Sequence, residues 1–126
     1  MKETIIAFTI VALVLLTCFY SANAASTFCD ELKRSVEKCM SSAYEESWDT
    51  VESEIKHAKE LFEQKSPLIE MISLHQKVDE VGTLIAKIQA AASIHDRAIV
   101  ITEARCLISH LDMIASSDSL TLRNIL

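Results

Sequence analysis

Histidine, cysteine and paired carboxylates are the side chains of this sequence that could carry catalysis or hold a metal. The four histidines are His57, His75, His95 and His110, and none belongs to a His-Glu-x-x-His motif or to another zinc-binding spacing. Glu54 and His57 form one Glu-x-x-His unit, but a di-iron site in a helical bundle needs two such units and two further carboxylates. We therefore expect no metal site and no cofactor.

One spacing brings a thiol and an imidazole together. Cys106 and His110 lie four residues apart, which places both side chains on one face of a helix, and such a pair is the minimal activated nucleophile. The sequence has no Gly-rich phosphate loop and no Gly-x-Ser-x-Gly motif, and a chain with a single glycine cannot easily build an oxyanion nest. We therefore expect that the protein is not an enzyme.

The N-terminal residues have the pattern of a secretory signal peptide. Lys2 precedes an almost unbroken apolar stretch from Ile5 to Tyr20, and the next four residues end at Ala24 in the small-x-small pattern that signal peptidase accepts. An uncleaved anchor is the alternative, but this apolar stretch is shorter than the about 20 residues that a spanning helix needs. We expect residues 1–24 to be removed, and residues 25–126 to form one helical domain that is secreted, extracellular and not membrane-bound.

Composition indicates the fold class and excludes some partners. The chain has one Gly and one Pro in 126 residues, whereas β-sandwiches and barrels need many such residues in their turns, so the fold should be all-α. The 18 acidic and 12 basic residues give a net charge of −6. Nucleic acids and anionic membranes bind clustered Lys and Arg, and we expect neither as a partner.

Apolar residues recur at helical spacing along most of the chain. This periodicity predicts helices over residues 28–40, 43–65, 67–92 and 98–116, and it shows no internal repeat. The predicted helix starts rest on a capping box of Ser42 with Glu45, on Ser66 before Pro67, and on a second capping box of Ser93 with Asp96.

Four amphipathic helices with short connections predict an antiparallel four-helix bundle. The alternative is a three-helix form in which residues 28–65 make one long first helix. Half of the apolar stripe of such a helix would be uncovered unless a second chain packed against it, so this form predicts a dimer.

The cysteines that remain after signal cleavage are Cys29, Cys39 and Cys106, and secreted thiols tend to form disulfides. Cys29 and Cys39 would lie about 15 Å apart on one helix, too far to be bonded. In an antiparallel bundle Cys106 lies nearer the level of Cys29, so we expect a disulfide-stabilised fold with a Cys29–Cys106 bond. Cys39 is then the odd thiol, either buried or bonded to a second chain in a dimer.

An acidic run that contains two aromatic residues is the candidate interaction surface. A solvated helix face and core packing are the simpler explanations, although Trp and Tyr are also common at interface hot spots. We expect a small secreted protein that binds an extracellular protein partner, as components of glandular, seminal, salivary or venom fluids do. The alternative is a carrier of a small apolar ligand in the bundle or dimer interior. The residues of the candidate surface are Tyr44, Glu45, Glu46, Trp48, Asp49 and Glu52.

Overall fold

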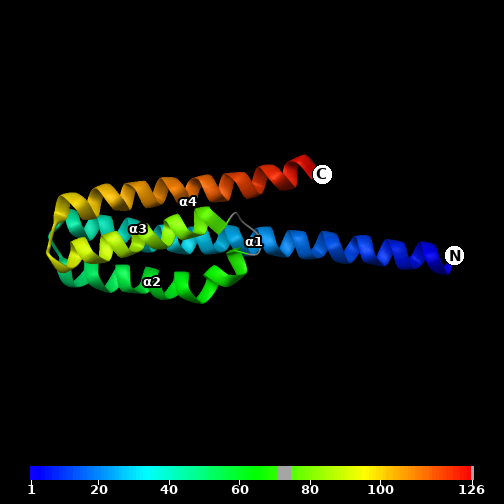
Figure 1. Ribbon diagram of the computed structural model, residues 1–126, viewed down its shortest axis with the longest axis horizontal. Coiled ribbons are helices and arrows are strands. Elements are labelled where there is room, and N and C mark those ends of the chain that lie inside the picture. Colours follow the sequence, from blue (N-terminus) through cyan, green and yellow to red (C-terminus); the bar gives the residue numbers. More distant parts are fainter. Residues whose placement is uncertain (71–74, 126) are drawn as a thin grey trace.

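A computed structural model describes the backbone of residues 1–70 and 75–125, and the side chains of residues 1–20, 23–24, 26–67 and 76–116. The described residues form four helices and no strand (Figure 1): α1 (Lys2–Tyr44), α2 (Trp48–Glu70), α3 (His75–Ser93) and α4 (Arg97–Ile125). The all-α fold class is therefore confirmed.

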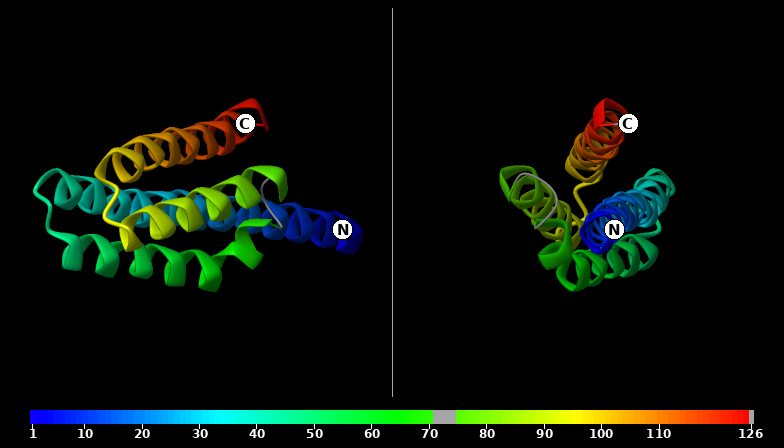
Figure 2. Two further views of the ribbon diagram at one scale, coloured as in Figure 1. Left: turned by 60° about the vertical axis from the view of Figure 1, so that its left-hand side comes forward. Right: turned by 90° about the vertical axis from the view of Figure 1, so that its right-hand side faces the viewer.

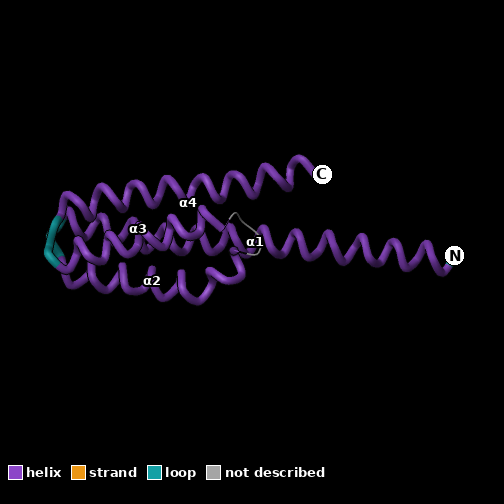
Figure 3. The backbone as a smooth tube through the Cα atoms, viewed as in Figure 1, coloured by secondary structure: helices purple, strands orange, loops and turns teal. Residues whose placement is uncertain are grey.

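The helices pack in a ring in which each one contacts its two neighbours. α1 lies against α2 and α4, and α3 lies against the same two helices, whereas the diagonal pairs make no close approach in the described part of the chain. Figure 2 shows the four helices around a common axis, with neighbours antiparallel. Both short turns, between α1 and α2 and between α3 and α4, lie at the same end of the molecule, which we call the turn end (Figure 3).

The interior is filled by the apolar stripes that the sequence predicts. Leu32, Val36, Ile88 and Leu107 are fully excluded from solvent, and they belong to a core to which all four helices contribute. Each such side chain contributes about 1.5–3 kcal/mol when it leaves water, which explains why helices of modest intrinsic propensity hold together.

The helix predicted to begin at residue 28 begins much earlier, because α1 is continuous with the apolar N-terminal segment. Residues 2–20 are exposed, and most of this segment projects beyond the other helices (Figure 1). The segment Lys2–Tyr20 is long and apolar enough to cross a membrane, a property that signal sequences share. Among the described side chains of α1, the first buried one is that of Phe28.

The predicted capping box at Ser42 and Glu45 is wrong. Ser42 lies inside α1 and is buried, and the helix continues to Tyr44. It ends in a Schellman motif, in which Ser47 N–H donates to Ser42 O at 2.9 Å and Glu46 N–H donates to Ala43 O at 3.2 Å. Glu46 takes the left-handed conformation, with φ of 59°, that this motif requires.

The turn between α3 and α4 repeats this geometry. Asp96 N–H donates to Ala91 O at 2.9 Å, His95 N–H donates to Ala92 O at 3.1 Å, and His95 has a φ of 54°. Asp96 is itself the cap of α4, because its Oδ1 accepts a hydrogen bond from Ile99 N–H at 3.2 Å. The expected reciprocal box with Ser93 is absent, since the Ser93 hydroxyl donates to Ala90 O instead.

The boundary predicted at Ser66–Pro67 is also wrong. α2 runs through Pro67 and ends at Glu70, and its last turns bend away from the axis of the rest of the helix (Figure 1). A proline within a helix removes one backbone hydrogen bond and bends the helix, but it does not always end it. The connection from α2 to α3, residues 71–74, lies outside the described residues.

Over residues 29–58 and 78–107 the two hairpins, α1–α2 and α3–α4, bury the same positions, so the structure contains a repeat that the sequence pattern does not show. Positions are equivalent when they lie equally far from Glu46 in the first hairpin and from His95 in the second. Buried residues then match buried residues in both helices of each hairpin: Leu32 with Val81, Val36 with Ile85, Ala43 with Ala92, Val51 with Val100, Ile55 with Ala104 and Ala58 with Leu107.

The expected disulfide is absent, because the described residues contain no disulfide bond. Cys106 Sγ lies 3.7 Å from His110 Nδ1, and His110 in turn faces α3, so the Cys106 side chain is held at the α3–α4 side of its helix. Cys29 is buried in α1. Helix level alone, on which the prediction rested, does not fix the direction in which a side chain points around the helix axis.

Candidate functional site

The turn end presents an exposed tyrosine held by two arginines. Tyr44, the last residue of α1, is 44% exposed. Arg105 Nη2 donates a hydrogen bond to the Tyr44 hydroxyl at 2.6 Å, and the guanidinium of Arg97 lies 5.8 Å from the centre of the ring, within cation–π range. Both arginines come from α4, so the tyrosine is fixed by the neighbouring hairpin.

An aromatic stack ties the two turns to each other. The rings of Trp48 and His95 are parallel within 3° and their centres are 4.8 Å apart. His95 Nε2 lies 4.0 Å from a carboxylate oxygen of Glu52, and Arg97 Nη1 lies 3.8 Å from one of Glu46. The turn end is therefore a connected surface, in which each hairpin supplies one side of every contact.

The structure brings the six predicted surface residues together at this end. Five of them are exposed, and Trp48, one of the two stacked rings, is half-buried. Four further residues complete the surface and were not predicted, because they come from the other hairpin and no local pattern marks them. One of these is an apolar residue that is 72% exposed, and the four are Ile94, His95, Arg97 and Arg105.

Cys106 and His110 do meet, as their spacing predicts, but their geometry does not suit nucleophilic catalysis. His110 Nδ1 lies 2.8 Å from Cys106 O, and because a carbonyl can only accept, the hydrogen bond requires the proton on Nδ1. That nitrogen then cannot take the thiol proton. The other ring nitrogen, Nε2, lies 3.2 Å from Glu80 Oε2. The three side chains form a contact between α3 and α4, in which His110 and Glu80 make an ion pair only when the imidazole is protonated.

Cys39, the predicted odd thiol, lies in the core between α1 and α2. Its Sγ–H points at Val51 O at 3.8 Å, and the residue is fully excluded from solvent. Burial, with a smaller contribution from the Glu54 carboxylate, raises the pKa of this thiol to about 11. A thiol in this position reaches a second chain only if the helices separate.

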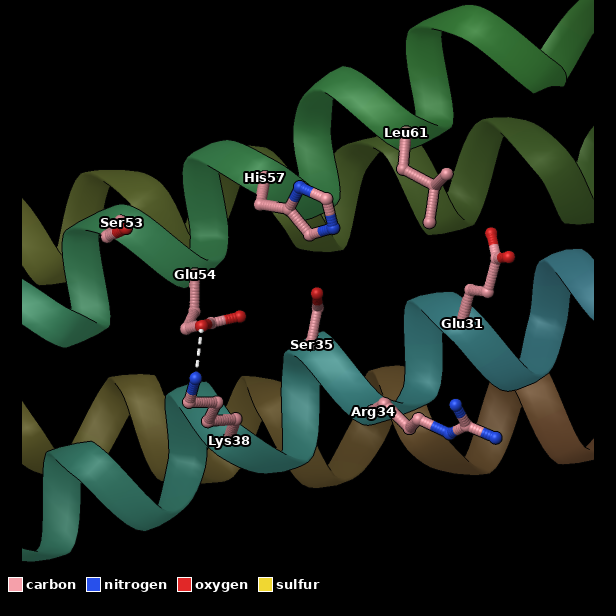
Figure 4. A pocket seen from close by; sticks show the side chains of 8 residues that line it. All are labelled: Glu31, Arg34, Ser35, Lys38, Ser53, Glu54, His57 and Leu61. Carbon is pink, nitrogen blue, oxygen red and sulfur yellow. Dashed lines mark ion pairs between the residues drawn. The ribbon is translucent and has the colours of Figure 1, made fainter.

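A polar groove of about 690 Å³ runs along the outside of the first hairpin, between α1 and α2. Figure 4 shows Ser35 and His57 facing each other across its middle, with Lys38 and Glu54 at one end. Glu31, Arg34 and Leu61 lie at the other end (Figure 4). We call this hollow the α1–α2 groove.

The second hairpin has a smaller groove at the equivalent place, between α3 and α4. It measures about 320 Å³, and its lining includes Glu80, Thr83, Leu84, Lys87 and His110. A third hollow of about 300 Å³ lies between α2 and α3 and includes Lys56 in its lining. The described residues hold no group of three metal-ligating side chains. All three hollows have charged side chains in their walls, which does not favour the alternative of an apolar carrier.

One family of proteins matches this chain over most of its length. The family, described as a domain of unknown function (DUF4363), matches residues 19–125. The chain belongs to the DUF4363 family. No curated protein and no solved structure shows a significant match.

The DUF4363 domain contains both hairpins and the whole turn end. Its match begins at Phe19, so nearly all of the apolar segment Lys2–Tyr20 precedes it. Every residue of the turn end and of the grooves therefore belongs to the domain itself.

Proposed function

We propose that this DUF4363 protein is a small secreted four-helix bundle that binds an extracellular protein partner through its turn end. The observation that carries the proposal is the pair of exposed side chains, Tyr44 and Ile94, on a surface stiffened by the Trp48–His95 stack. A large side chain that is already held in place, as Tyr44 is by Arg105, loses little conformational entropy on binding, which makes it a good interface anchor.

The charges around these anchors indicate the chemistry of the partner. Glu46 already lies close to the Arg97 guanidinium, and Glu52 lies close to the His95 ring, both of the second hairpin. Glu45 and Asp49 are exposed and have no ion pair among the described residues. A partner surface with Lys or Arg opposite these two carboxylates, and an apolar recess for Tyr44 and Ile94, is complementary to the turn end.

Site-specific photo-crosslinking in the fluid that surrounds the producing cells tests this proposal. A photoreactive phenylalanine analogue replaces Ile94, and in the control it replaces Met113, an apolar residue on α4 that is 53% exposed. We expect one crosslinked product of defined mass from position 94 and none from position 113. Equal products from both positions, or none from either, would overturn the proposal.

The captured protein is then purified and its affinity is measured directly. We expect Tyr44→Ala to weaken binding by about tenfold or more, the size of a hot-spot effect, and Glu45→Lys with Asp49→Lys to slow association. Glu60→Lys, an exposed change on α2 outside the turn end, serves as the charge control. If Glu60→Lys has the same effect as the turn-end charge changes, the partner senses only net charge and the proposed surface is wrong.

Secretion has its own test. The N-terminal sequence of the protein in the medium should begin at Ala25 or a close neighbour, since Ser21–Ala24 matches the cleavage pattern. The start of the DUF4363 match at residue 19 supports a separate leader. Protein that stays in the membrane fraction with Met1 or Lys2 at its N-terminus would contradict secretion.

A further inference from the structure

The α1–α2 groove differs from its counterpart in the second hairpin at the positions that face the hollow. Ser35 stands where the second hairpin has Leu84, Arg34 where it has Thr83, and His57 where it has Cys106. The frame is the same, so the polar character of the groove is a property of these side chains and is not a by-product of the fold.

Ser35 is the most informative of these residues. It is 94% buried, because its relative exposure is 6%, and no hydrogen-bond partner for its hydroxyl exists among the described residues. Figure 4 shows the hydroxyl pointing from α1 into the groove toward α2. No fully buried side-chain nitrogen or oxygen of the described residues lacks a partner, so the hydroxyl oxygen of Ser35 itself reaches the hollow, where water or a ligand can bind it. Leu84 at the equivalent position shows that the core accepts an apolar residue there.

When the ion pairs of the groove are counted, two basic side chains have no acidic partner. Glu54 Oε1 accepts from Lys38 Nζ at 3.0 Å, and Glu31 Oε2 lies 3.4 Å from Lys65 Nζ, so both carboxylates of the lining are already paired. Arg34 and His57 have no hydrogen bond or ion pair in the part of the chain that the structure describes. An unpaired guanidinium and imidazole in a hollow of an acidic protein form a site for a negative group.

We propose that the α1–α2 groove binds a small molecule through an oxyanion, a carboxylate or a phosphate. Arg34 supplies paired N–H donors, the Ser35 hydroxyl donates one hydrogen bond from the floor, and the His57 ring closes the opposite wall. Leu61 contacts the apolar part of the ligand. The groove, at about 690 Å³, has the size of ordinary small-molecule sites. This site is separate from the turn end and does not depend on it.

We expect the equivalent groove of the second hairpin to bind no anion, because its side chains differ. His110, at the position of Leu61, lies beside Glu80 at 3.2 Å, so its ring is already paired with a carboxylate. Thr83 and Leu84 replace Arg34 and Ser35, which removes the two main donors. Lys87 corresponds to Lys38 and provides a matched control for loss of one positive charge.

Amide NMR titration tests the proposal on the full chain, held in a neutral detergent that shields the apolar N-terminal segment. Sodium phosphate and sodium acetate are added in separate arms, each against sodium chloride at matched ionic strength. We expect saturable shifts of α1–α2 groove signals that chloride does not produce. Saturation by phosphate alone, by acetate alone or by both supports the site and identifies the oxyanion. Shifts equal to those of chloride in both arms would overturn it.

Three variants locate the binding. Arg34→Gln should weaken it about tenfold or more, the effect of losing a charge-assisted bond, and Ser35→Ala should weaken it several-fold with the fold preserved. Lys87→Gln should leave it unchanged. Equal weakening by Lys87→Gln, or unchanged binding in both groove variants, would assign the shifts to general screening and overturn the proposal.

Discussion

The two hairpins of this protein share a backbone plan but differ in the groove that each one forms. Both turn through a left-handed residue, Glu46 or His95, and both bury the same sequence of positions on either side of it. In the α3–α4 hairpin a histidine and a glutamate close the groove to about 320 Å³. In the α1–α2 hairpin the equivalent hollow is about 690 Å³ and has unpaired polar side chains.

This difference teaches which part of a helical hairpin is free to vary. The buried side chains must together fill the core without gaps, although the sizes at single equivalent positions differ, because voids and overpacking both cost free energy. Groove positions contact solvent on one side, so their size, charge and pairing can change without a change in the frame.

Leu107 and Ala58 occupy equivalent buried positions with side chains of different size. We expect Leu107→Ala to lower the free energy of unfolding by about 3 kcal/mol, from lost burial and the cavity left behind. Urea denaturation followed by circular dichroism measures it. The exposed Met113→Ala on the same helix should change stability by less than about 0.5 kcal/mol. A loss below about 1 kcal/mol for Leu107→Ala would show that the second hairpin is loosely packed.

Cys39 and Ile88 are the next equivalent pair, and only the cysteine titrates. Its pKa is raised from 9.0 to about 11 in the folded state by burial first and Glu54 second. The unfolded chain therefore loses the thiol proton at a lower pH than the folded protein does. The folded state keeps its full stability below pH 9, and it loses stability as the pH rises to about 11, because ionisation then favours the unfolded chain. The difference between these two pKa values corresponds to about 3 kcal/mol in the free energy of unfolding.

The measurement compares wild type with Cys39→Val across this pH range. Tyrosine and lysine residues titrate in both proteins, so the difference between the two curves isolates the thiol. We expect the stability difference to shift by about 3 kcal/mol in favour of the valine variant between pH 9 and pH 11. Parallel curves would mean that Cys39 ionises equally well in the folded protein.

Gly82 breaks the equivalence of the hairpins by bringing α2 close to α3. A Cβ at this position would lie 3.0 Å from Cε1 of the Phe62 ring, which explains a glycine inside a helix. We expect Gly82→Ala alone to lower stability by about 1 kcal/mol, because the ring must move. With Phe62→Leu as the background, the same change should raise stability by about 1 kcal/mol through helix propensity. If the Phe62 ring did not contact this position, Gly82→Ala would change the free energy of unfolding in the same direction in the wild type and in the Phe62→Leu background.

His110 and Leu61 are equivalent, and their exchange tests what closes the second groove. His110→Leu removes the contact of the imidazole with the Glu80 carboxylate, a partly exposed pair whose side chains are 25% and 49% exposed. We expect a change in unfolding free energy below about 1 kcal/mol, as for other surface pairs. Urea denaturation measures it, with Ser109→Ala as the exposed neighbour control. A loss above about 2 kcal/mol would make this pair a structural part of the hairpin.

Much of the fold could be predicted from periodicity and composition. The apolar stripe through Leu32, Val36, Val51 and Ile55 is buried as predicted, because a period of 3.6 residues places these positions on one helix face. The helix ends were predicted less well. Glu46 and His95 take left-handed conformations that usually belong to glycine, and Pro67 lies inside α2, so no local residue type marked where α1, α2 and α3 end.

The residues of the turn end and of the α1–α2 groove also divide into those that the sequence could indicate and those that it could not. The acidic and aromatic residues around Tyr44 and Trp48 were predicted because they are neighbours in sequence. Their partners Arg97 and Arg105, and the facing of Ser35 by His57, join positions that are far apart in the chain. Only the rotation of each helix about its axis decides such meetings. That rotation also turned His110 toward Glu80 of α3.

The sequence by itself determined that this protein is helical, which faces of its helices are apolar, and that an apolar segment precedes the domain. These properties depend on side-chain type and on spacing within one helix. The tertiary structure decided the pairing of the hairpins, the contacts of the turn end and the contrast between the two grooves. These depend on how helices rotate and pack to fill a common core, a balance over all four helices that no single segment contains.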